Sequence, residues 1–101
     1  MTSLQGYIKA SYDELVEEFG SPDYFVSPGL SCDTSLSDDK VETEWELYDD
    51  ELGMVTIYDW KEYDGGATSR SGQLYRWHIG GANRKAVEVV SNRLNRNAWY
   101  A

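Results

Sequence analysis

The chain has 101 residues, of which 41% are hydrophobic and 14% aromatic, and its formal net charge is −9. This length suits one domain, and the content of large apolar side chains is too high for a disordered chain. The single cysteine, Cys32, excludes an internal disulfide and a cysteine-based metal cluster.

The charge is divided unevenly along the chain. Residues 1–64 hold 17 of the 18 acidic residues and 3 of the 9 basic ones, so the two halves carry formal charges of −14 and +5. Either the halves pair their charges on folding, or the molecule presents a strongly negative face and a small positive one. We do not expect the acidic face to bind duplex DNA. The sequence shows no long apolar run or secretion signal, so we also expect no membrane association and a cytoplasmic location.

The first helix is predicted to begin after Ser11. Ser11 and Glu14 have the spacing of a capping box, and apolar residues recur on one helical face over residues 12–19. Gly20 can adopt the positive φ that ends a helix. Short strands are expected before and after this helix, around residues 7–8 and 24–26.

A long loop and three strands are predicted to follow. Residues 21–40 contain both prolines and a run rich in Ser and Asp, which is typical of a loop. Apolar and acidic residues alternate over residues 41–48, as in a strand with one face on the core. Residues 54–60 are apolar on both faces and predict a central strand covered on both sides, and residues 74–79 predict a third strand.

The second helix is predicted to start at Ala82 or Asn83 and to end at Arg96, after Gly80 and Gly81 have ended the third strand. The tail, residues 97–101, carries two aromatic side chains that either dock on the domain or await a partner. The predicted fold is therefore a single α+β domain over residues 1–101. It has the order α-β-β-β-α, with an antiparallel meander and helices packed on it.

The acidic strand is the first candidate site. Its outward side chains and the turn that follows form an acidic face that consists of Glu42, Glu44, Glu46, Asp49, Asp50 and Glu51. Such a row is either a solvated surface or a surface that imitates a row of phosphates and docks on a groove lined by Lys and Arg.

The junction between the third strand and the second helix is the second candidate. Two glycines allow a ligand to approach the backbone, and a helix start offers N–H groups to an anion. The predicted anion-binding residues are His78, Gly80, Gly81, Asn83, Arg84 and Lys85. The alternative is that the two glycines only make a tight turn.

Three stretches carry a resemblance to known proteins: SYDELVEEFGSPDY, EWELYDDELGMVTIYDWKEY and YRWHIGGANRKAVEVV. In these stretches the chain resembles small acidic α+β proteins encoded by bacteriophages, of the anti-defence or anti-CRISPR-like kind. The helix followed by FG-P and aromatic strands is also similar to the small outer-membrane assembly lipoprotein domain, which implies topology alone.

These observations predict a non-catalytic binding protein that has no metal, cofactor or catalytic residues. The leading hypothesis is a phage-type inhibitor whose acidic face docks on the basic nucleic-acid groove of a bacterial defence complex in the host cytoplasm. One alternative is a sponge that sequesters a signalling nucleotide at the Gly80-Gly81 junction. A small structural or assembly module and a homodimer are further alternatives.

Overall fold

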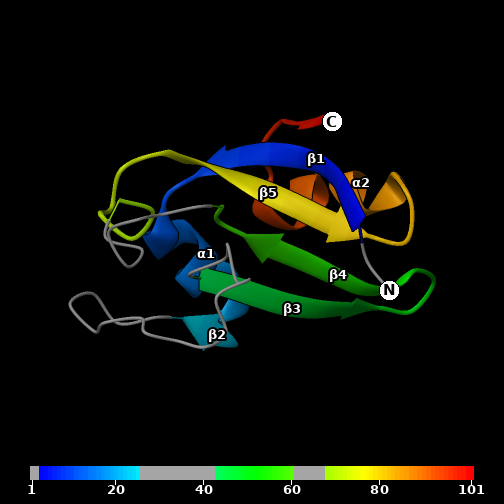
Figure 1. The fold of residues 1–101 in the computed structure, drawn as a ribbon, viewed down its shortest axis with the longest axis horizontal. Coiled ribbons are helices and arrows are strands. Elements are labelled where there is room, and N and C mark those ends of the chain that lie inside the picture. Colours follow the sequence, from blue (N-terminus) through cyan, green and yellow to red (C-terminus); the bar gives the residue numbers. More distant parts are fainter. Residues whose placement is uncertain (1–2, 26–42, 61–67) are drawn as a thin grey trace.

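A computed structural model describes residues 3–25, 43–60 and 68–101 (Figure 1). Its elements are β1 (Ser3–Ala10), α1 (Tyr12–Phe19), β2 (Tyr24–Phe25), β3 (Thr43–Asp49), β4 (Gly53–Tyr58), β5 (Tyr75–Gly81), α2 (Lys85–Leu94) and β6 (Ala98–Tyr100). The predictions for Cys32, Val41 and Glu42 lie outside the described residues.

The strands form one antiparallel sheet with the order β2-β3-β4-β5-β1-β6. β3, β4 and β5 make the predicted meander, and with α1 and α2 they confirm the α+β class and the α-β-β-β-α order. The sheet is wider than predicted. β1 pairs with β5 from Ala10 back to Ser3, and its register shifts between Leu4 and Gly6. The aromatic tail forms β6 on the other side of β1, so it docks on the domain.

Helix α1 has the predicted limits because its two ends are capped as expected. The Ser11 hydroxyl accepts a hydrogen bond from the Glu14 backbone N–H at 3.1 Å, and the Glu14 carboxylate accepts one from the Ser11 N–H at 2.9 Å. Gly20 has a φ of 87°, and its N–H donates to the Val16 carbonyl. The capping box and the glycine stop are therefore confirmed.

Helix α2 is shorter than predicted at both ends. The Asn83 side chain accepts a hydrogen bond from the Lys85 N–H at 2.8 Å, so residues 82–84 form a turn that precedes the helix. Asn95 ends the helix in the left-handed conformation, with a φ of 56°. Asparagine adopts this conformation more readily than most residues, which explains why the helix ends before Arg96.

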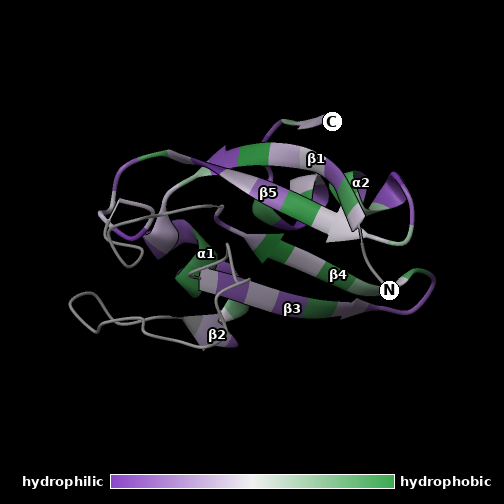
Figure 2. Cartoon of the chain, in the orientation of Figure 1, coloured by the Kyte–Doolittle hydropathy of each residue, from purple (hydrophilic) through white to green (hydrophobic). Residues whose placement is uncertain are grey.

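Both helices pack on the same face of the sheet, behind it in the view of Figure 1. Residue hydropathy alternates along β3 and β5 (Figure 2), and the apolar side chains face the helices. Trp45 and Trp77 are fully buried there, with ring centroids 5.3 Å apart. Their indole N–H groups donate to the carbonyls of Gly20 and Ala10, at 2.8 and 2.9 Å.

The acidic and basic halves of the sequence meet where the two helices lie side by side. Arg96 of the segment after α2 lies 2.7 Å from Glu14, and Arg93 lies 3.2 Å from Glu18. The hydrogen bond from the Ser11 backbone lowers the pKa of Glu14, burial opposes this shift, and Arg96 lowers the pKa further. Two arginines of the basic half therefore pair with acids of the first half, which supports the first of the two alternatives, pairing of charges on folding, for this part of the molecule.

Candidate functional site

The face of the sheet opposite the helices carries a row of aromatic side chains. In the strand register, Glu44 of β3 lies opposite Tyr58 of β4, Tyr58 opposite His78 of β5, His78 opposite Tyr7 of β1, and Tyr7 opposite Trp99 of β6. Residues directly opposite one another in a sheet point to the same face. We call this helix-free face the outer face, and we call Tyr58, His78, Tyr7 and Trp99 the aromatic row.

The rings of the aromatic row are in contact with one another. The ring centroid of His78 lies 5.3 Å from that of Tyr58 and 5.1 Å from that of Tyr7, and Tyr7 lies 6.1 Å from Trp99. Trp60, which follows β4, joins the group at 5.9 Å from His78. Trp60 and Trp99 are 42% and 40% exposed. The outer face therefore presents indole rings to solvent at both ends of a packed row.

A buried carboxylate holds the end of β4 beside this row. Asp59 is fully buried, and it accepts hydrogen bonds from the Thr43 N–H at 2.9 Å and the Ser69 hydroxyl at 2.8 Å. Its own N–H donates to the Thr43 carbonyl at 3.1 Å. Asp59 ties β4 to β3 at the residue before Trp60, and so positions that indole. In the sequence, Asp59 alternates with Val55 and Ile57 and so falls on the helix side, which is a signal for a buried carboxylate.

His78 is held as a neutral imidazole in the middle of the aromatic row. Burial lowers its pKa, Arg76 lowers it further, and Asp59 opposes the shift. Its Nδ1 atom is buried and has no hydrogen-bond partner among the described residues. In the described part of the chain, His78 is thus a ring packed between other rings.

The predicted acidic face is divided by the structure. Glu44 and Glu46 lie on the outer face as predicted, and Glu46 is exposed. Asp50 and Glu51 are exposed in the turn between β3 and β4. Asp49 is engaged in that turn, where its carboxylate accepts hydrogen bonds from the N–H groups of Glu51 and Leu52 at 2.9 and 3.0 Å. We therefore assign Asp49 to the turn and leave it out of the binding surface.

The structure corrects the premise of the anion site. Gly80 and Gly81 do not form a turn before the helix, because both are paired with β1 as part of β5. A Cβ at Gly80 would lie 2.5 Å from the Thr56 hydroxyl, and one at Gly81 would lie 2.5 Å from the Ala86 Cβ. At both glycines, the place of a side chain is therefore taken by neighbouring atoms of the chain itself.

The other predicted anion-binding residues are not gathered around one point. His78 is on the outer face, whereas Gly81 faces α2. Arg84 lies over the ring of Tyr100, with 4.1 Å between its guanidinium carbon and the ring centroid. Lys85 lines a cavity of about 230 Å³ together with acidic residues, and these are Asp49, Glu51 and Glu88. Carboxylates beside that lysine oppose the binding of an anion.

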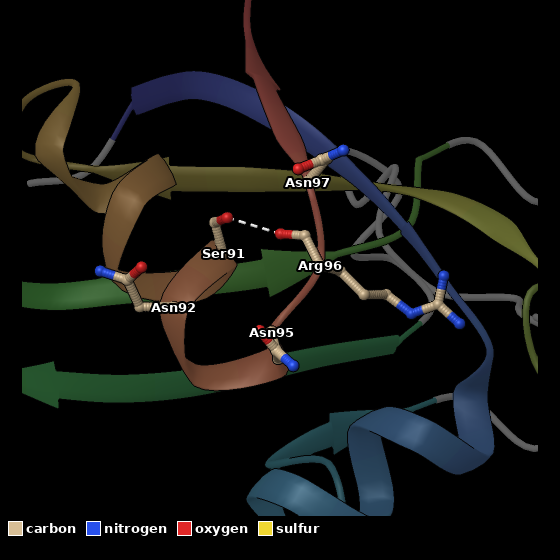
Figure 3. Close-up of a pocket in the computed structure, with 5 residues that line it drawn as sticks. All are labelled: Ser91, Asn92, Asn95, Arg96 and Asn97. Carbon is tan, nitrogen blue, oxygen red and sulfur yellow. Dashed lines mark hydrogen bonds between the residues drawn. The ribbon is translucent and has the colours of Figure 1, made fainter.

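A second cavity, of about 360 Å³, lies at the end of α2 (Figure 3). It is lined by Ser91, Asn92, Asn95, Arg96 and Asn97. The Ser91 hydroxyl donates to the Arg96 carbonyl, and the Arg96 guanidinium extends away from the other lining side chains toward Glu14. The cavity is thus lined by three asparagine amides, one serine hydroxyl and Arg96, and this lining includes no His, Cys, Asp or Glu.

The comparisons with known proteins add no relative. No protein-family model matches the chain, and neither a curated protein nor a solved structure matches it. The described residues contain no group of three or more His, Cys, Asp or Glu that could hold a metal ion. In the same part of the chain, no helix is long and apolar enough to cross a membrane.

Proposed function

We propose that the chain is a non-catalytic binding protein that acts through its outer face, and that its partner is a protein with a basic surface. The observation that carries this proposal is the position of Glu44 and Glu46 on the same face as the aromatic row. Exposed aromatic rings beside charged side chains are typical of protein interfaces, in which Trp and Tyr supply much of the binding energy.

Charge complementarity supports a basic partner. On the helix side, Arg93 and Arg96 pair with acids of α1. On the outer face the carboxylates lie over β3, and the exposed acids Asp50 and Glu51 of the adjoining turn extend the negative region. A negative surface of this kind accelerates association with a basic groove and repels nucleic acid.

The partner class that we propose is a bacterial defence complex, whose basic groove holds nucleic acid. The resemblance of the sequence to bacteriophage proteins is the reason for this choice, and the acidic outer face is compatible with it. The sponge hypothesis has less support, because the residues of the predicted anion site are spread over both faces of the sheet.

The test is capture of partners from a bacterial lysate by the wild-type chain and by two charge-reversed variants. Glu46→Lys changes an exposed glutamate of the outer face, and Glu17→Lys makes the same charge change on an exposed glutamate of α1. We expect Glu46→Lys to lose a captured protein that Glu17→Lys retains, and the retained binding to weaken as salt is raised. Equal loss in both variants would show that net charge alone causes capture, and would refute a surface on the outer face.

A further inference from the structure

The strand β6 forms one edge of the sheet. Among the described strands it pairs with β1 alone, and no described helix or strand lies beyond it (Figure 1). Trp99 and Tyr100 are 40% and 42% exposed at this edge. An open edge presents backbone N–H and C=O groups to a further strand, and proteins commonly protect such edges with charged side chains or proline. Residues 97–101 contain neither of these.

The hydrogen-bond pattern shows which backbone groups of β6 face the open edge. The Ala101 N–H donates to the Gln5 carbonyl of β1 at 3.0 Å. Along an antiparallel strand the backbone groups of successive residues point to opposite sides, so those of Trp99, two residues earlier, also point to β1. The register of β1 and β6 runs without a shift over this stretch. The N–H and C=O groups of Ala98 and Tyr100 therefore point away from the sheet.

We propose that two copies of the chain form a dimer in which their β6 strands pair antiparallel across a twofold axis at Trp99. In this register Ala98 of each copy lies opposite Tyr100 of the other, and the two residues of each pair exchange N–H···O bonds in both directions. The two Trp99 side chains become direct neighbours on the outer face, where aromatic pairs stabilise a sheet. The aromatic row then continues from one copy into the other.

The composition of β6 favours pairing with its own copy in this register. An interface across a twofold axis has to be complementary to itself, and here the large Tyr100 meets the small Ala98 on the helix side. A register centred on Tyr100 would pair Tyr100 with its own copy and leave the outward groups of Ala98 without a partner in β6. The opposite edge of the sheet, β2, has only two residues, so head-to-tail pairing of β6 with β2 offers fewer backbone groups.

The formal charge of −9 per copy opposes dimerisation only weakly at this edge. Glu44 and Glu46 on β3 lie four strand spacings from β6, which is roughly 19 Å at the usual spacing in a sheet. Exposed charges farther apart than about 8 Å are largely screened at physiological salt. Beside β6, Arg84 lies over the Tyr100 ring and the Tyr100 hydroxyl donates to Glu88, so charges of both signs border the edge.

The first measurement is backbone amide hydrogen exchange, followed by NMR spectroscopy. An edge of three residues is small, so we expect a weak dimer whose dissociation constant lies between about 10 µM and about 1 mM. As the protein concentration rises through this range, exchange at the Ala98 and Tyr100 amides should slow, because they gain a partner in the dimer. The Trp99 amide, which points to β1 in each copy, should slow by a smaller factor and is the internal control.

The second measurement is the dissociation constant of three variants in analytical ultracentrifugation. Trp99→Lys places like charges opposite each other on the twofold axis, and we expect it to raise the constant at least about tenfold. Tyr48→Lys makes the same charge change at an 81% exposed aromatic residue of β3, and should leave the constant within about twofold. Ala98→Pro removes an N–H that faces the edge and keeps the bonds to β1, and it should raise the constant about tenfold or more.

Circular dichroism shows whether each variant is folded, and if Trp99→Lys is not, Ala98→Pro and the amide exchange decide. A wild-type chain that stays monomeric up to about 1 mM would overturn the proposal, because that concentration is the upper limit expected for so small an edge. Equal effects of Trp99→Lys and Tyr48→Lys would also overturn it. Masses that grow beyond a dimer would show head-to-tail pairing and overturn the symmetric register. None of these outcomes depends on the basic partner, whose capture is tested with Glu46→Lys.

Discussion

On the helix-covered face of the sheet Trp45 and Trp77 are fully buried, whereas on the outer face Trp99 is 40% exposed. The buried indoles have their N–H groups bonded to backbone carbonyls, and they pack edge to face. The rings of the outer face pack against one another and border carboxylates. Aromatic content alone therefore does not distinguish the core from an exposed face, whereas the neighbours of each ring do.

The largest expected effect is the difference in the free energy of unfolding between a tryptophan substitution on the helix-covered face and one on the outer face. Trp77→Ala removes a fully buried ring, and we expect it to lower the free energy of unfolding by about 3–5 kcal/mol. Trp99→Ala removes a half-exposed ring, and we expect a loss of about 1 kcal/mol or less. Urea titration followed by circular dichroism measures both. Similar losses in the two variants would contradict the division into a core face and an exposed face.

A smaller effect is expected where α2 packs on β5. Gly81→Ala places a Cβ within 2.5 Å of the Ala86 Cβ, and we expect this overpacking to lower the free energy of unfolding by about 1–3 kcal/mol. Ala86→Gly in the same chain should relieve part of that strain, so the double-mutant cycle should show a favourable coupling of about 0.5 kcal/mol or more. Additive effects of the two changes would mean that the glycine has another role.

The smallest expected effect is a dependence of stability on pH at His78. The pKa of His78 is lowered in the folded state. Above about pH 6.5, the ordinary pKa of histidine, His78 is neutral in both the folded and the unfolded chain, so its titration does not change the free energy of unfolding there. Below that pH the unfolded chain takes up the proton first, so the free energy of unfolding falls until the lowered pKa of the folded state is passed.

The measurement for this prediction is the urea midpoint of the wild-type chain and of His78→Phe between about pH 7 and pH 5. The variant keeps a ring in the row and lacks the titrating group, so its midpoint should fall less over this interval. Parallel curves for the two proteins would show that His78 protonates equally well in the folded and unfolded chains.

Much of the fold could be predicted from the sequence because local signals agree with it. The capping box at Ser11 and the glycine stop at Gly20 are local features, and they mark the limits of α1. Alternation along a strand is also local, and it puts the neighbours Trp77 and His78 on opposite faces of the sheet. Both inferences need only the residues of one element.

The features that the sequence analysis missed depend on contacts between elements. β6 has only three residues, and its pairing with β1 is formed by residues 90 to 94 positions apart. Gly80 and Gly81 looked like a turn, but they are accommodated in β5 because Thr56 and Ala86 occupy the space beside them.

The aromatic row could not be predicted for the same reason. Its members come from four strands, and only the register of those strands brings them into line. The expectation that residues 54–60 are covered on both sides was right for the helix face and for Thr56 on the outer face, which is 6% exposed. On the outer face Met54 is 37% and Trp60 42% exposed.

The most direct test of a cation-binding outer face is a titration of the isotopically labelled chain with octa-arginine, followed by the backbone amide resonances in NMR spectra. We expect the largest shift changes in β3, β4 and the adjoining part of β5, around Glu44, Tyr58 and His78. The amides of α1 around Glu17, which is also acidic and exposed, should change little. Largest changes at α1, or changes spread evenly over both faces, would contradict the assignment of the binding surface.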